Sequence, residues 1–207
     1  QKDDYKGGAR ISAIAFGIGQ YGYVGTGYNG NYQKDFYRFD PQAAAGQQWE
    51  IVNGFGGQKR QGGTSFVIDD KAYICCGVNN GSYVYDFWCF DPSTGVFTQL
   101  RDIADTSDDD YDDDYTSIVR ANAVSFVIDG KGYLVTGEYG SLLSNYWIYD
   151  PATDLWEGED LTAFEGSVRK NAVAFSTGTR GFVVTGQASS SYYDDTWELS
   201  PYEYEEE

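Results

Sequence analysis

The 207-residue chain contains no histidine and no methionine, and it has only three cysteines and four prolines. The absence of histidine excludes Ser-His-Asp and Cys-His catalytic triads and the commonest zinc sites. No stretch reaches the roughly 18 apolar residues that a membrane span requires. A chain of this length can bury roughly 70% of its unfolded surface, so we expect one domain whose core needs neither a metal nor a disulfide.

Basic residues are also scarce, because 14 Lys and Arg stand against 32 Asp and Glu and give a net charge of -18. This charge repels polyphosphate backbones and acidic lipid headgroups, which argues against nucleic acid or an anionic membrane as a partner. The lack of methionine, with Gln1 as the first residue, indicates a removed signal segment or a piece of a longer protein.

The three cysteines, Cys75, Cys76 and Cys89, cannot all pair within the chain. A disulfide between the adjacent Cys75 and Cys76 would be strained, whereas one between Cys76 and Cys89 across neighbouring strands is possible. We interpret all three as buried thiols that act as small apolar residues.

Glycine and aromatic residues are abundant instead: the chain has 26 Gly, 19 Tyr, 12 Phe and 5 Trp. Aromatic side chains suit the pleated surface of strands, and glycine reaches the backbone angles that tight turns need. The composition therefore predicts an all-β protein with little helix.

These residues recur with a period of about fifty residues. Counting from an arginine, an aromatic residue follows at six positions, a second at thirteen and a glycine at seventeen, in four copies without a gap. Successive arginines lie 50, 60 and 49 residues apart, so only the second interval is stretched. The arginines are Arg10, Arg60, Arg120 and Arg169, and the glycines are Gly27, Gly77, Gly137 and Gly186.

Each copy predicts four antiparallel strands. An apolar strand ends at a tight turn such as Asp129–Gly130, and a nearly continuous apolar second strand, such as Gly132–Thr136, is expected where both faces are covered. The third strand alternates, as in Tyr146–Tyr149, and a following Asp-Pro turn leads to the fourth. In the first three copies the fourth strand begins near Trp49, Phe97 and Trp156. Four-stranded units repeated around an axis are the blades of a β-propeller.

From Arg10 to Pro201 the chain resembles the kelch repeat family, to which the propeller domain of galactose oxidase also belongs. Kelch units have a glycine pair at the end of the second strand, followed at fixed spacing by a tyrosine and a tryptophan. Here the second glycine is always present, and the first is replaced by Thr26, Cys76, Thr136 and Thr185. The tryptophan is kept as Trp88, Trp147 and Trp197, and Tyr37 takes its place in the first copy.

The resemblance implies a single kelch β-propeller domain over residues 1–207, with repeat units at about 10–59, 60–119, 120–168 and 169–207. The four blades form either a complete ring or part of a larger propeller. The segment before Arg10 is too short for the aromatic strand that precedes the other arginines, and the last copy has only residues 202–207 for its outer strand.

The loops between the second and third strands form a candidate binding surface, because antiparallel order places them on the same side as the links between blades. Tyrosine gives recognition loops rigid contact area, and small polar residues give adaptable hydrogen bonds. The alternative is that turns are rich in Asn, Gly and Ser for backbone reasons alone. The candidate ligand-binding residues are Tyr28, Asn29, Tyr32, Asn79, Asn80, Tyr83, Tyr139, Tyr192 and Tyr193.

The stretched interval contains an acidic link, RDIADTSDDDYDDDYTS from Arg101, which is expected to project on that same face. Six aspartates within Asp108–Asp114 could bind calcium through carboxylate oxygens. Their spacing does not match the calcium loop with its central glycine and terminal glutamate. Because runs of like charge repel and stay extended, we interpret the link as a solvated acidic loop.

The four repeat arginines allow two interpretations. They could form a cationic ring that binds an anionic ligand in two-point geometry. Alternatively, each pairs with a repeated acid, such as Asp35, Asp86 or Asp195, and we favour this structural role. Asn145 breaks the acidic pattern in the third copy, so the pairing cannot be universal. The repeated glycines and tryptophans are likewise expected to be structural.

Copper-radical oxidation, the chemistry of galactose oxidase, uses histidine ligands and cannot be carried over to a chain without histidine. We therefore predict no enzyme activity and no cofactor. The chain also resembles exported and outer-membrane-associated kelch proteins of bacteria. This resemblance implies a binding module of the bacterial cell envelope, in the periplasm or at the cell surface, that recognises a protein or a glycan and is either lipid-tethered or free. The alternatives are a structural subunit of an outer-membrane or cell-surface complex and a carbohydrate-active enzyme that uses two carboxylates.

Overall fold

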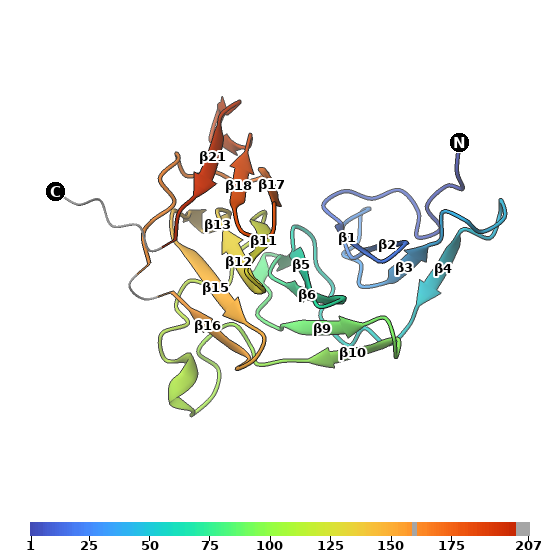
Figure 1. Ribbon diagram of the computed structural model, residues 1–207, viewed down its shortest axis with the longest axis horizontal. Helices are drawn as coiled ribbons and strands as arrows, with labels where there is room; N and C mark the ends of the chain where they lie inside the picture. Colours follow the sequence, from blue (N-terminus) through green and yellow to red (C-terminus); the bar gives the residue numbers. More distant parts are fainter. Residues whose placement is uncertain (159–160, 202–207) are drawn as a thin grey trace. The chain divides into compact units, whose positions relative to one another are not determined.

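The computed structural model describes residues 1–158 and 161–201, and these residues form strands, turns and one short 3-10 helix, η1 (Asp110–Asp112). The chain divides into two compact units, Gln1–Leu100 and Arg101–Glu207, and each unit contains two large antiparallel sheets (Figure 1). The predicted fold class, four antiparallel blades of a β-propeller, is confirmed. Among the described residues there is no helix long and apolar enough to cross a membrane.

In the first unit the two sheets contain β1 (Ile14–Ile18), β2 (Tyr21–Gly25), β3 (Phe36–Phe39) and β4 (Trp49–Val52), then β5 (Thr64–Ile68), β6 (Lys71–Cys75), β9 (Trp88–Asp91) and β10 (Val96–Gln99). In the second unit they contain β11 (Val124–Ile128), β12 (Lys131–Val135), β15 (Tyr146–Asp150) and β16 (Leu155–Glu157), then β17 (Val173–Ser176), β18 (Gly181–Val184) and β21 (Thr196–Leu199). The outer strand predicted for the last blade falls on residues 202–207, outside the described residues.

Two-residue turns connect the first and second strands of the middle blades. The register Ile68↔Lys71 leaves Asp69 and Asp70 as the turn between β5 and β6, with φ of +49° and +57°. The turn between β11 and β12 has the same form, with φ of +47° and +77°. Two successive left-handed residues are typical of the type I′ turn, whose twist matches that of the paired strands and which favours Asp and Gly.

The recurring glycine after each second strand is left-handed in all four copies, with φ between +90° and +102°. A Cβ atom on Gly77 would lie 2.7 Å from the carbonyl oxygen of Gln61 and 2.9 Å from the amide nitrogen of Gly63. Backbone angle and space both exclude a side chain there, which explains the recurrence. The preceding residue is also left-handed, with φ between +59° and +65°, although it is Thr26, Cys76, Thr136 or Thr185.

Each unit has its core between its two blades. In the first unit, Ile14 of β1 belongs to one buried cluster with Ala72 and Ile74 of β6. In the second unit, Phe126 of β11 lies close to Gly181 of β18: a Cβ atom on Gly181 would be 2.1 Å from the phenyl ring of Phe126. Within each unit, the first strand of the first blade therefore packs on the first two strands of the second.

All three cysteines belong to the second blade: Cys75 and Cys76 are buried at the end of β6, and Cys89 is half-buried on β9. Their surroundings agree with their interpretation as small apolar residues of the second blade.

Candidate functional site

The loops after the second strands are held to the start of their own blades. In each blade an isolated antiparallel β-bridge joins the residue after the repeat arginine to the residue after the recurring glycine. In the second blade these two residues are Gln61 and Val78. Three of the loops then form short hairpins, namely β7 (Val78–Asn79) with β8 (Ser82–Tyr83), β13 (Glu138–Tyr139) with β14 (Ser141–Leu142), and β19 (Gln187–Ala188) with β20 (Ser191–Tyr192). In the first blade a single bridge between Tyr28 and Tyr32 takes the place of a hairpin.

Two of these loops and the link between the first two blades line a pocket of about 180 Å³, which we call the loop pocket. The rings of Tyr28 and Tyr32 meet edge to face, with centroids 5.1 Å apart. The loop pocket offers aromatic rings, amide groups and one ammonium group, and its lining residues are Tyr28, Gly30, Asn31, Tyr32, Lys59, Asn79 and Asn80. Asn31 and Lys59 are not among the residues predicted from the sequence.

Hydrogen bonds within the first loop fix the shape of this pocket. The side-chain amide of Gln33 donates to Asn29 Oδ1 at 2.9 Å and to the carbonyl of Asn31 at 3.1 Å. The backbone amide of Gln33 donates to the carbonyl of Gly27 at 2.9 Å. Asn29, which was predicted to bind ligand, therefore orders the loop and does not line the pocket.

The other predicted tyrosines have unlike surroundings. Tyr139 is 50% exposed and Tyr192 is 82% exposed, both on the hairpins of the second unit. The ring of Tyr193 instead lies against the guanidinium group of Arg169, whose Cζ is 4.4 Å from the ring centroid. Tyr83 is half-buried on β8 and does not line the loop pocket. The structure thus brings together four of the nine predicted residues, namely Tyr28, Tyr32, Asn79 and Asn80.

The four repeat arginines lie inside their blades. In every copy Nε donates to the carbonyl two residues earlier, and Nη1 donates to the carbonyl sixteen residues later, at the end of the second strand. The Arg10 side chain is 3% exposed, and the other three arginines are fully buried. Guanidinium groups in this position connect strands and are not available to a soluble anion, so the geometry favours the structural role over the cationic ring.

A carboxylate binds the arginine in three of the four copies. Asp35 and Asp195 contact Arg10 and Arg169 through both oxygens, and Asp86 contacts Arg60 through one oxygen while the other accepts a hydrogen bond from the backbone amide of Gln58. In the third copy Asn145 offers Arg120 its side-chain oxygen at 3.1 Å and its carbonyl oxygen at 3.0 Å. An amide therefore occupies the position that a carboxylate has in the other blades.

The pair in the last blade gives the first testable prediction. The hydrogen bond from Arg169 lowers the pKa of Asp195 from 3.8 to about 2. Because the folded pKa is the lower one, the pair stabilises the fold fully above about pH 4, and this contribution is lost as the pH falls through about 2. We expect the difference in the free energy of unfolding between the unmodified chain and Asp195→Asn to shrink over that range in urea titrations. A difference that does not change with pH would contradict the pairing.

An aromatic residue five positions before each arginine belongs to the same sites and was not predicted. Its ring meets the repeat tryptophan, or Tyr37 in the first copy, edge to face with centroids 5.4 to 6.3 Å apart. In three copies the guanidinium carbon lies 5.0 to 5.6 Å from its centroid. The constant offset is visible in the sequence as Tyr5, Phe55, Tyr115 and Phe164. The segment before Arg10 supplies this ring through Tyr5.

The acidic link is folded and not extended, although five of the six aspartates in Asp108–Asp114 are exposed to solvent, as expected of a solvated loop. Asp112 is buried and accepts hydrogen bonds from the backbone amides of Thr106 and Ser107 and from the Ser107 hydroxyl, at 2.9 to 3.0 Å. Tyr115 is also buried, and its hydroxyl oxygen accepts a hydrogen bond from the backbone amide of Trp156 on β16 at 2.8 Å. These hydrogen bonds outweigh the repulsion between the aspartates. They also hold the link over β16, the edge strand of the third blade.

The first part of the link also lies at a different end of the blade from the one predicted. The backbone amide of Arg101 donates to Asp154 at 3.2 Å, and its side chain donates to the carbonyl of Thr153 at 3.4 Å. These two residues form the turn between β15 and β16, which antiparallel pairing places at the end opposite the loop between β12 and β15. The first part of the acidic link therefore does not belong to the loop face.

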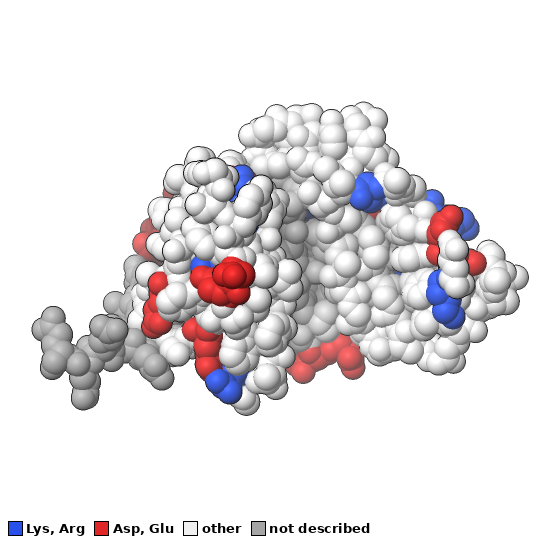
Figure 2. Space-filling view, turned by 90° about the horizontal axis from the view of Figure 1, so that it is seen from above, with Lys and Arg blue, Asp and Glu red and all other residues white. Residues whose placement is uncertain are grey.

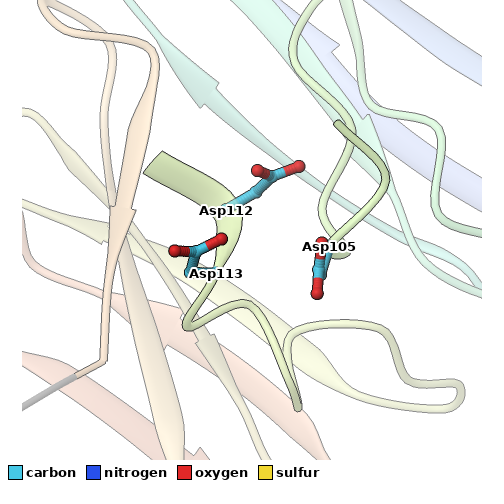
Figure 3. Close-up of side chains that lie close together, drawn as sticks. All are labelled: Asp105, Asp112 and Asp113. Carbon is cyan, nitrogen blue, oxygen red and sulfur yellow. The ribbon is translucent and has the colours of Figure 1, made fainter. Parts of the chain in front are cut away.

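Three aspartates of the link have carboxylate oxygens within 4.8 Å of one another, namely Asp105, Asp112 and Asp113 (Figure 3). Only two of them belong to the range Asp108–Asp114 that was considered for calcium. The oxygens of Asp112 already accept the three hydrogen bonds described above, which gives this residue a role in closing the link on itself. Calcium binding at Asp108–Asp114 stays an untested alternative to the solvated loop that we predict.

Acidic and basic atoms form small separate groups among neutral ones on the face shown in Figure 2. Exposed side chains pair in both units, as in Arg38 with Glu50 at 2.7 Å and Arg180 with Glu198 at 2.5 Å. On that face the net charge of -18 is therefore not gathered into one continuous acidic surface.

Comparison with known proteins agrees with this architecture. Residues 59–102 match the kelch motif, and this range includes all four strands of the second blade. The solved structure of YjhT is similar to the chain with a TM-score of 0.68 and 18% identity, over 93% of this chain and 66% of YjhT. The chain thus spans slightly less than two thirds of YjhT, and the likeness concerns the fold. The curated proteins contain no match. The kelch motif in the second blade and the likeness of the fold to that of YjhT both agree with the β-propeller architecture of the chain.

Proposed function

We propose that the chain is a non-catalytic binding module that recognises a protein or a glycan through the loop pocket. Kelch propellers are generally binding modules, and this supports the general class. The observation that carries the proposal is the convergence of tyrosine and asparagine side chains from separate loops with Lys59 of the inter-blade link. Rigid blades hold all three segments, so the pocket is formed before a ligand arrives.

The size and chemistry of the loop pocket set the kind of ligand. A volume of about 180 Å³ lies below the roughly 300 to 1,000 Å³ of pockets for drug-sized molecules, so it fits one side chain or one sugar ring. Amide side chains both donate and accept hydrogen bonds, and tyrosine offers a ring and a hydroxyl group. Such groups suit the polar and C–H surfaces of a peptide or a sugar.

Substitutions in the loop pocket provide the test. We expect Tyr32→Ala or Asn79→Ala to weaken binding about tenfold or more, because each removes part of the lining of a small central pocket. Binding would be measured by calorimetry with the best ligands from a panel of oligosaccharides and peptides. The matched control is Tyr85→Ala, which removes a 41% exposed tyrosine of the second loop that does not line the pocket. An equal loss in the control would contradict a role for the loop pocket.

One observation favours a structural subunit as a second candidate function. Val173 and Phe175 on β17 are 61% and 51% exposed, whereas their counterparts in the third blade, Val124 and Phe126, are buried. Exposed apolar side chains on a sheet face are suited to permanent packing against another chain. Sedimentation of the purified chain distinguishes the two functions, because a stable monomer would contradict an obligate subunit.

The absence of turnover and the location in the bacterial cell envelope are parts of the same proposal. The missing histidine supports the first, and the resemblance to exported bacterial kelch proteins supports the second. Turnover on a glycan panel that one Asp or Glu substitution abolishes would overturn the non-catalytic assignment. Recovery of the protein in the cytoplasmic fraction of its native cells would overturn the location.

A further inference from the structure

A second cavity, of about 330 Å³, lies in the second unit between the acidic link and the outer strands of the third blade; we call it the link cavity. Its volume is within the range of known ligand sites. Four aromatic side chains contribute to its lining: Tyr111, Tyr115, Trp147 and Trp156. Carboxylates contribute at Asp114, Asp150 and Glu157, and Lys131 adds one ammonium group. None of these residues belongs to the loop pocket.

The charge of the link cavity favours a cation. Lys131 lies 3.2 Å from Asp150, so this pair contributes little net charge. Asp114 and Glu157 are exposed at the same cavity and add two negative charges, of which the Arg101 guanidinium group on the ring of Tyr111 offsets one. Eight aspartates lie between Arg101 and Val119, and their field extends beyond the cavity. An anionic ligand would be repelled and a cationic one concentrated here.

The aromatic lining favours an organic cation over a metal ion. Ring faces attract ammonium and guanidinium groups, and the apolar stem of a lysine or arginine side chain can pack on them while its charge meets a carboxylate. The chain already contains one such contact at the link, because the guanidinium carbon of Arg101 lies 4.6 Å from the ring centroid of Tyr111. A metal ion would use the carboxylates alone, and a neutral sugar would gain nothing from the charge.

We infer that the link cavity binds a lysine or arginine side chain of a basic protein segment. This surface is separate from the loop pocket, so it would give the module a second contact with a partner of defined charge.

The probe is the peptide acetyl-Gly-Ser-Lys-Ser-Gly-amide, titrated into the full chain at low salt while NMR follows the indole signals of Trp147 and Trp156. We expect saturable binding that weakens at least tenfold when the lysine is acetylated on its side chain. Asp114→Asn and Glu157→Gln should each weaken binding about fivefold, and Tyr111→Ala should do so without a change in the thermal melting of the chain. The matched control is Asp109→Asn, an exposed aspartate of the same link that does not line the cavity.

Three results would overturn the inference. Equal weakening by Asp109→Asn and Asp114→Asn would assign the attraction to the acidic link as a whole. Equal binding of the acetylated peptide would show that charge is not recognised, and a failure of the lysine peptide to saturate would show that the cavity does not bind it. The variant Tyr32→Ala distinguishes this outcome from failure of the proposed function, because it alters only the loop pocket.

Discussion

Gly77→Ala is expected to lower the free energy of unfolding by about 3 kcal/mol, because the new side chain combines backbone strain with a steric clash. Gly77 has φ of +99°, and the added Cβ would lie 2.7 Å and 2.9 Å from two backbone atoms of the neighbouring segment. Backbone atoms cannot move aside as the end of a flexible side chain can. The measurement is chemical denaturation of the purified variant, followed by tryptophan fluorescence.

Gly81→Ala is the matched control for this prediction. Gly81 belongs to the same blade and is also left-handed, with φ of +84°, but no atom lies within 4 Å of a Cβ placed there. Only the cost of the backbone conformation then applies, which is about 1 kcal/mol. Equal losses for the two variants would show that the close approach of the backbone at Gly77 has no energetic weight.

Asp86→Ala is expected to cost about 3 to 5 kcal/mol, because it removes one partner of a buried ion pair. Arg60 is fully buried and the side chain of Asp86 is 9% exposed, so water cannot replace the lost carboxylate. The substitution also removes the acceptor of the backbone amide of Gln58. Denaturation at neutral pH would measure the loss, with circular dichroism to establish that the variant still folds.

Asp86→Asn should be much less damaging than Asp86→Ala. The third blade already holds this arrangement, since Asn145 offers two neutral oxygens to Arg120. An asparagine keeps an acceptor of the same shape, whereas an alanine leaves the guanidinium group with an empty space. If both variants lost the same stability, the hydrogen-bonding geometry at this position would be irrelevant and only the charge would matter.

The fold could be predicted because each structural role occurs four times in the sequence. The two aromatic residues and the glycine at fixed distances from each arginine locate the first two strands of each blade. The observed bounds of β12 and β15 differ by at most one residue from the segments predicted at Gly132–Thr136 and Tyr146–Tyr149. The left-handed position of Thr136 could not be predicted from its residue type, because a β-branched residue rarely adopts positive φ. Only the kelch glycine pair marks that position.

The site was predicted less well, because loop composition does not determine which side chains converge. Tyr32 and Tyr193 belong to equivalent loops, yet one lines a pocket and the other packs on an arginine. Likewise, a run of aspartates predicts repulsion, but it does not show that Asp112 finds three donors in its own segment. The aromatic residues before the arginines, by contrast, follow a fixed offset and were predictable.

The constant spacing between these aromatic residues and the arginines shows where the repeat tolerates extra sequence. The aromatic residue before the arginine lies six positions after the fourth-strand aromatic residue in the first interval, Trp49 to Phe55, and eighteen positions after it in the stretched one, Phe97 to Tyr115. The five residues from the ring to the arginine never vary in number, so the next blade begins in the same frame. An engineer who grafts an epitope or a tag into this scaffold would therefore insert it immediately upstream of the ring, at Phe55 or Phe164, where the protein has already accommodated a natural insertion in another copy.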